Sequence, residues 1–189
     1  MSIPKDYQKL KAQPGDPSHC TNYGKQTDSA LCYVSVFLVN SNEAMDFNDR
    51  DGLIEGIHGA LAENQALIEV GAGSKGLIQY IYSIVKTLTE NGVLYTLLIH
   101  NNYVSHVVAV RGFFEEYGIT GIRDATVFEL YRREHPDFGP EEWAYDPYDA
   151  NSQAKFKMIV SEQEKYDELF PDHPLSQCRE LLKHVIATL

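Results

Sequence analysis

The chain has 189 residues, of which 43% are apolar and 23% charged, a composition that indicates one folded domain and excludes extensive disorder. Its 16 Lys and Arg against 27 Asp and Glu give a net charge of −11, and such a chain repels phosphate groups. We therefore expect no binding to nucleic acid or to an anionic membrane. No apolar run reaches the length of a membrane-spanning helix.

The N-terminal residues 1–15 are polar and lack the apolar stretch of a signal peptide. We expect a cytoplasmic protein, or one carried into another cell by a specialised system without a cleaved signal. The three cysteines, Cys20, Cys32 and Cys178, are odd in number, widely spaced and without a CxxC pair. These features argue against a disulfide framework and against a structural zinc site, and we expect no metal and no cofactor.

Residues 1–24 are polar and contain several prolines, which predicts an extended arm ahead of a single domain at 25–189. In the first part of that domain, apolar residues recur at helical spacing. Asp28 or Ser29 can cap a helix there, and Gly92 can end a later one. The patterns predict helices over Leu31–Val39, residues 51–69 and residues 74–91.

The pattern changes to dense, β-branched and aromatic runs after residue 92. A hairpin turn is expected at residues 115–118, and a long loop around Trp143. Strands are predicted over Val93–Ile99, His106–Phe114, Ile119–Phe128 and Lys155–Val160, and an amphipathic helix over Ser176–Leu189. Helices followed by antiparallel strands indicate an α+β fold.

Cys32 lies in the first turn of the predicted helix over 31–39. The positive end of a helix macrodipole lowers the pKa of a thiol and favours the nucleophilic thiolate. One interpretation is that Cys32 attacks an acyl carbon. The other is a buried core cysteine, which is common, and the position of the residue alone does not separate the two.

Other polar residues could complete such a site. His106 opens a predicted strand, where an imidazole could act as base and then as acid, with His100 as its competitor. Asp124, on the next predicted strand, could hold that imidazole in one tautomer, and Asp146 is a second candidate for this role. Gln26 could help to line an oxyanion hole together with the backbone N–H of Cys32.

Two stretches of the sequence carry a family resemblance. Residues 26–35, QTDSALCYVS, and residues 91–113, with SHVVAVRGF at their end, resemble the cysteine helix and the histidine strand of papain-like cysteine proteases. The bacteriocin-leader-processing and bacterial-effector branches are the most similar. The resemblance covers about residues 24–128 and implies N-terminal helices, with the nucleophile at a helix start, packed on a C-terminal antiparallel sheet. It further implies that the catalytic residues are Cys32, His106, Asp124 and Gln26.

The activity expected from this resemblance is attack on a peptide or glutamine amide through a thioester. Peptide hydrolysis of a protein or peptide substrate is the first hypothesis, and glutamine deamidation or transglutamination is the alternative on the same machinery. Such an enzyme would suit an effector or toxin delivered into another cell. The sequence does not indicate an oligomeric state.

Two further classes of function stay open. Residues 71–76, GAGSKG, match the GxGxxG pattern and resemble the glycine-rich loop of dinucleotide-binding enzymes and of S-adenosylmethionine methyltransferases. The following strand ends in His100-Asn101, without an acidic residue for a ribose, so a glycine-rich turn is the competing interpretation. The third class is a non-catalytic interaction domain, such as an immunity or adaptor protein.

Overall fold

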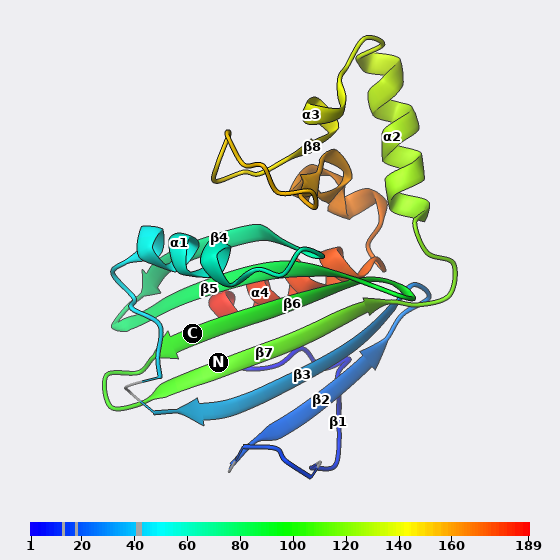
Figure 1. Cartoon of the computed structure of the whole chain (residues 1–189). Helices are drawn as coiled ribbons and strands as arrows, with labels where there is room; N and C mark the ends of the chain where they lie inside the picture. The colour runs from blue at the N-terminus through cyan, green and yellow to red at the C-terminus, as the bar shows by residue number, and fades with distance from the viewer. Residues whose placement is uncertain (13, 18, 41–42) are drawn as a thin grey trace.

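The structure, a computed structural model, describes residues 1–12, 14–17, 19–40 and 43–189. These residues form a seven-stranded antiparallel sheet in the order β1-β2-β3-β7-β6-β5-β4 and a two-stranded sheet, β8-β9 (Figure 1). The strands are β1 (Gln8–Lys9), β2 (Thr21–Gln26), β3 (Ala30–Val39), β4 (Gln65–Lys75), β5 (Ile78–Thr89), β6 (Gly92–Asn102), β7 (Val107–Glu116), β8 (Ala144–Tyr145) and β9 (Met158–Ile159).

Two helices pack on opposite faces of the large sheet. Figure 1 shows α1 (Arg50–Ala60) in front of the sheet, beside β4, and α4 (Pro174–Ala187) behind it, where it contacts β3, β6 and β7. After β7 the chain leaves the sheet and enters α2 (Ile122–Glu134), which projects away and is followed by α3 (Pro140–Trp143). The short helices η1 (Val160–Glu162) and η2 (Glu164–Leu169) lead back to α4. Within the described residues, no helix is both long and apolar enough to cross a bilayer.

The papain-like α+β arrangement expected from the sequence is wrong. The large sheet draws strands from both halves of the chain, and the central cysteine helix of that arrangement is replaced by the strand β3. Residues 1–24, expected as an extended arm, contribute β1 and part of β2 to the sheet. The sheet rather than a helical layer is therefore the framework on which each candidate residue is placed.

The predictions for individual helices and strands are confirmed in some segments and wrong in others. The strands predicted over 93–99 and 106–114 are confirmed by β6 and β7, and the helix predicted over 176–189 by α4. The helix predicted over 51–69 ends at Ala60, and β4 follows it. Three predictions are wrong: 31–39 and most of 74–91 are strands, and 119–128 runs from a loop into α2. The strand predicted over 155–160 shortens to β9.

The hydrophobic core lies between the sheet and α4. Side chains of a strand alternate between the two faces of a sheet, so every second residue points to α4. On that face lie Cys32 and Val34 from β3, Leu97 from β6, and Phe114 from β7, together with Leu181 from α4. All five are at most 5% exposed, which makes this face the main source of stabilisation by apolar burial.

Buried ion pairs attach the segment before α4 to the sheet and to α2. The Lys86 ammonium lies 2.8 Å from the Glu162 carboxylate, which also accepts a hydrogen bond from the Tyr95 hydroxyl. Arg123, 1% exposed, pairs with Asp167 at 2.9 Å. Because a buried charge without its partner is costly, these pairs fix the path of the chain from η1 to α4.

Candidate functional site

Cys32 lies in the core and not at a helix start. It is 5% exposed, in the middle of the sheet face that α4 covers. Burial raises the pKa of its thiol to about 11, against a weaker lowering by the Lys25 ammonium. At neutral pH the residue is a protonated thiol, which is a poor nucleophile.

His106 lies far from Cys32. Cys32 pairs across the ladder with Phe114, and His106 precedes that residue on the chain by eight positions, just ahead of β7. At about 3.3 Å per strand residue, the two side chains are roughly 26 Å apart along the sheet. The His106 ring stacks on Tyr103 at 5.4 Å, and its Nδ1 is 3.0 Å from the Ser105 hydroxyl. The structure does not bring this imidazole and the Cys32 thiol together.

The other two residues of the proposed constellation also lie apart from the thiol. Asp124 is in the first turn of α2, where its carboxylate accepts a hydrogen bond from the Ser161 hydroxyl at 2.5 Å. Gln26 pairs with Leu31 and is exposed, whereas its neighbour Lys25 pairs with Cys32. Adjacent strand residues point to opposite faces, so the Gln26 amide lies on the face of the sheet that Cys32 does not share.

The glycine-rich stretch 71–76 belongs to a hairpin. Gly71 and Gly73 lie on β4 opposite Tyr82 and Tyr80, whose rings occupy the space that a Cβ would take. Gly76, with φ +62°, forms the turn into β5. A strand follows this turn where a nucleotide-binding loop would open a helix, and the glycines have a structural explanation.

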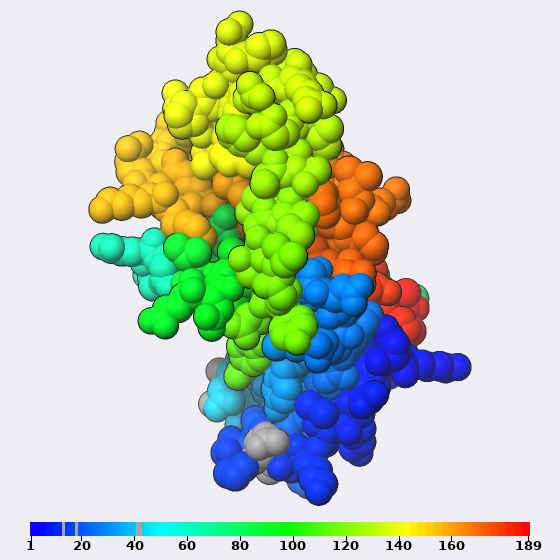
Figure 2. Space-filling view, turned by 90° about the vertical axis from the view of Figure 1, so that its right-hand side faces the viewer, coloured from blue at the N-terminus to red at the C-terminus, as the bar shows by residue number. Residues whose placement is uncertain are grey.

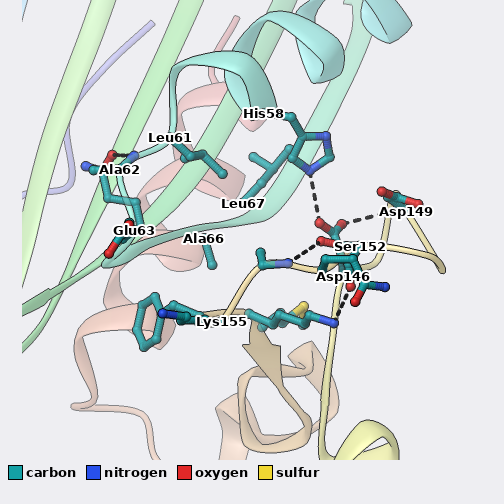
Figure 3. Close-up of a pocket in the computed structure, with 16 residues that line it drawn as sticks. His58, Leu61, Ala62, Glu63, Ala66, Leu67, Asp146, Asp149, Ser152 and Lys155 are labelled. Carbon is teal, nitrogen blue, oxygen red and sulfur yellow. Dashed lines mark hydrogen bonds and ion pairs between the residues drawn. The ribbon is translucent and has the colours of Figure 1, made fainter.

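Asp146, the alternative carboxylate, lies beside a different histidine. Figure 3 shows His58 of α1 pointing at Asp146 across a pocket of about 450 Å³ between the end of α1, the start of β4 and the loop 146–158. His58 Nε2 is 3.1 Å from an Asp146 carboxylate oxygen, close enough for an ion pair when the imidazole is protonated. The other oxygen accepts hydrogen bonds from the backbone N–H groups of Tyr148 and Asp149.

The side chains around the His58 imidazole limit the chemistry that this pocket can carry out. The pocket wall carries one hydroxyl, that of Ser152, which accepts a hydrogen bond from the backbone of Ala154. Among the described lining residues there is no cysteine, and Asp146 is engaged in holding its own turn. The arrangement fastens the loop 146–158 to α1 and offers no activated nucleophile.

A second pocket lies at the base of α2 and has a different character. Its walls come from the β2–β3 turn, the linker between β7 and α2, and residues 169–173, and its volume is about 220 Å³. In Figure 2 the yellow-green start of α2, the orange segment and the blue β2–β3 turn meet on the face turned toward the viewer. We call it the hinge pocket. Its lining includes Ile119, Ile122, Leu169, Phe170, Glu116 and His173.

The rim of the hinge pocket is apolar and unusually exposed. Ile119 is 77% exposed, Leu169 61% and Ile122 52%, although all three are aliphatic. They gather around one opening, whereas isolated exposed apolar residues are ordinary on protein surfaces. An apolar cluster around a pocket is typical of surfaces that bind another molecule.

The floor of the hinge pocket carries two buried polar groups that face one another. His173 is the N-cap of α4, and its Nδ1 accepts a hydrogen bond from the Leu175 N–H, so that the proton of the neutral ring is on Nε2. Burial, followed by the nearby Arg123 and Arg179 guanidinium groups, lowers the pKa of His173 to about 3. The ring is therefore neutral at physiological pH.

Glu116 is the second group on this floor. Its two carboxylate oxygens accept hydrogen bonds from the backbone N–H groups of Val93 and Gly121. The nearest carboxylate oxygen is 3.9 Å from His173 Nε2, beyond hydrogen-bond length. Both side chains are about nine-tenths buried, and in the described part of the chain Nε2 forms no hydrogen bond. A donor and an acceptor are thus left facing each other across a gap that a hydroxyl group can bridge.

Comparison with known proteins adds no family. No protein-family model and no curated protein matches the chain. Across the described ranges of the sequence, no group of three or more His, Cys, Asp or Glu side chains is placed to hold a metal ion. Its function is therefore inferred from the geometry of the chain itself.

The sequence reasoning missed the hinge pocket. His173-Pro174 ahead of an amphipathic run is an N-cap followed by proline at the first helical position. That signal could have located the start of α4. No local pattern links it to Glu116 or to Ile119, because these meet only through the fold.

Proposed function

We propose that the protein is a non-catalytic interaction domain that captures a tyrosine side chain of a partner protein in the hinge pocket. The observation that carries the proposal is the unbonded gap between His173 Nε2 and the Glu116 carboxylate at the bottom of an apolar opening. A phenol hydroxyl accepts a hydrogen bond from Nε2–H and donates one to the carboxylate, while its ring contacts the apolar wall.

Two further observations favour binding over catalysis. The pKa of the Cys32 thiol is raised and that of the Cys178 thiol, fully buried, is raised further, so neither is activated. Moreover, a pocket of about 220 Å³ is smaller than the roughly 300–1,000 Å³ of a typical small-molecule site. This volume suits one large side chain, the kind of anchor around which protein interfaces are built.

The charge around the pocket indicates what flanks the tyrosine. Asp28 and Asp172 lie at the rim, and within the described residues neither carboxylate has a hydrogen bond or an ion pair. The chain as a whole carries a net charge of −11. A partner segment with Lys or Arg next to its tyrosine would be steered to this face, and salt would weaken the encounter.

The proposal is tested by selecting peptides from a random display library on the purified protein. We expect the selected peptides to share a tyrosine with basic neighbours. Replacing that tyrosine by phenylalanine should weaken binding by about tenfold or more, because the buried His173 Nε2–H is then left without an acceptor and the phenol's hydrogen bond to the Glu116 carboxylate is lost. Leu169→Asp and Ile119→Asp should abolish binding by placing a charge on the apolar wall.

Leu77→Asp is the matched control. Leu77 is 86% exposed in the β4–β5 turn, away from the pocket, and we expect this variant to bind as the unmodified protein does. Selected peptides without tyrosine, or peptides that bind Leu169→Asp and the unmodified protein equally, would contradict the proposal. Circular dichroism of each variant separates lost binding from lost folding.

A further inference from the structure

The sheet face opposite α4 is the second surface of interest, and it is independent of the hinge pocket. Around Phe113, on β3, β7 and β6, no described helix covers it, because α1 lies over β4 (Figure 1). The loop before α1 covers the far end of this face, where the Met45 N–H donates a hydrogen bond to Nδ1 of the buried His100 on β6. Leu31, Tyr33 and Phe37 from β3 point to this side, with Phe113 from β7. We call this surface the open face. Tyr33 and Phe113 are neighbours on it, with ring centroids 6.4 Å apart.

The residues of the open face are ordered in rows across the strands. The ladder places Tyr33, Phe113 and Thr96 in one row. On one side of it lies the row Leu31, Glu115 and Leu94; on the other side lies the row Ser35, Arg111 and Leu98. The rows on either side of Phe113 thus carry opposite charges on β7, each flanked by a leucine of β6.

This order is self-complementary. A two-fold axis along the row of Phe113, in the plane between two stacked sheets, reverses the strand direction of the second copy. Glu115 of one copy then faces Arg111 of the other, and Leu94 faces Leu98, while Phe113 meets its own equivalent. An interface built on a two-fold axis needs this property, in which residue i contacts j and j contacts i.

Neither Arg111 nor Glu115 has an ion pair among the residues that the structure describes. The Arg111 guanidinium lies over the Phe37 ring at 5.3 Å, and no carboxylate of the described residues pairs with it. Glu115 likewise has no ion pair or side-chain hydrogen bond among the described residues. Four residues on one strand span about 13 Å, so the two cannot reach each other within one copy. A second copy supplies the partner that each lacks.

The size of the face fits a small interface. Over β3, β7 and β6, with about seven residues of each strand, it extends over roughly 350 Å² in projection. The accessible surface of its side chains is larger, and it lies toward the lower end of the range of specific protein interfaces. Hollows of about 560 and 550 Å³, lined by Leu94 and Phe113 and by Leu98 and Phe37, leave room for interdigitating side chains.

We propose that the open face binds a second copy of the chain, giving a two-fold symmetric sandwich of two sheets with paired Arg111 and Glu115. Two sheets packed in this way are about 10 Å apart and cross at roughly 30°. The arrangement buries the aromatic pair of Tyr33 and Phe113 at the centre, and the hinge pocket lies outside it.

Charge reversal tests the pairing directly. Arg111→Glu or Glu115→Arg alone places like charges opposite each other in the homodimer, and we expect the dissociation constant to rise by about tenfold or more. An equimolar mixture of the two variants restores both attractive pairs. Sedimentation equilibrium should therefore show a dimer for the unmodified chain, weaker self-association for each variant, and a heterodimer in the mixture.

Two more variants complete the experiment. Phe113→Asp should give a monomer, and Leu77→Asp, outside the face, should remain dimeric. A monomeric unmodified chain at about 200 µM, or a mixture of charge variants no tighter than either variant alone, would overturn the inference. A monomer that still binds tyrosine peptides would contradict the dimer and leave the proposed function intact. A dimer that binds no tyrosine peptide would contradict the proposed function and leave the dimer intact.

Discussion

Phe113 and Phe114 are adjacent on β7 and differ completely in their surroundings. Phe114 is 0% exposed beneath α4, whereas Phe113 lies on the open face beside Tyr33. On β3, likewise, Cys32 points to the face that α4 covers, and its neighbours Leu31 and Tyr33 point to the open face. What decides whether a side chain can act on another molecule is the face of the sheet, and the face depends on a shift of one residue.

This difference accounts for the raised pKa of Cys32, which the sequence analysis placed at the start of a helix. On the covered face Cys32 loses contact with water, and its thiol stays protonated. On surfaces that α4 does not cover, aromatic, charged and exposed aliphatic residues stay accessible. Both proposed binding surfaces lie there, and the covered face supplies stability.

The largest expected effect contrasts the two phenylalanines. Phe114→Ala should lower the free energy of unfolding by about 3–5 kcal/mol, because it leaves a cavity beneath α4. Phe113→Ala should cost no more than about 1 kcal/mol, since its side chain already contacts solvent. Urea denaturation at a concentration where the chain is monomeric measures both, and equal losses would show that the open face is covered after all.

A smaller effect is expected from His173, whose side chain is about nine-tenths buried but lines the hinge pocket. Its pKa of about 3 in the folded state is below the ordinary value of 6.5, so the unfolded chain binds more protons between these pH values. Stability must therefore fall as the pH drops below about 6.5. Between pH 7 and pH 5, the unmodified protein should lose about 2 kcal/mol more than His173→Asn, in which the N-cap is kept.

Urea titrations of both proteins at pH 7, 6 and 5 measure this difference. His100, whose pKa burial also lowers, is present in both proteins and cancels. Parallel stability curves for the two proteins would contradict the buried, neutral state of His173.

Alkylation by iodoacetamide at pH 7.5 should have the smallest effect on the protein. It tests directly the hypothesis that Cys32 is a reactive cysteine. Cys20 is half-buried ahead of β2, and Cys32 and Cys178 are in the core. We expect Cys20 to be labelled first and Cys32 about a hundredfold more slowly, at the rate of unfolding events. Rapid labelling of Cys32 below pH 7 would mean that its thiol is activated.

The sequence predicted part of this fold, and the reasons for the failures are specific. β6 and β7 were found because their runs are dense in β-branched, aromatic and other apolar residues, and α4 was found because its apolar residues recur at helical spacing. The segment 74–91 has apolar residues at helical spacing. Its strand β5 buries Ile81 on one face and Ile84 on the other, so apolar and polar residues do not alternate along it. Its richness in Ile, Val, Tyr and Thr was the better signal.

The candidate site could not be predicted for a different reason. Cys32 and His106 were placed together by analogy, although the register of β3 with β7 puts them at opposite ends of the sheet. The hinge pocket joins Glu116 at the end of β7 to His173 at the start of α4. Such a pair arises only when the chain has folded, and no spacing in the sequence encodes it.

The proposed capture of tyrosine is tested most directly by methyl NMR on Ile119, Ile122 and Leu169 during titration with N-acetyl-tyrosinamide and, in parallel, N-acetyl-phenylalaninamide. We expect the tyrosine compound to shift these three methyl signals and the His173 ring signals, with an affinity about tenfold or more above that of the phenylalanine compound. Shifts of equal size and affinity from both compounds, or no shifts around the hinge pocket, would contradict it.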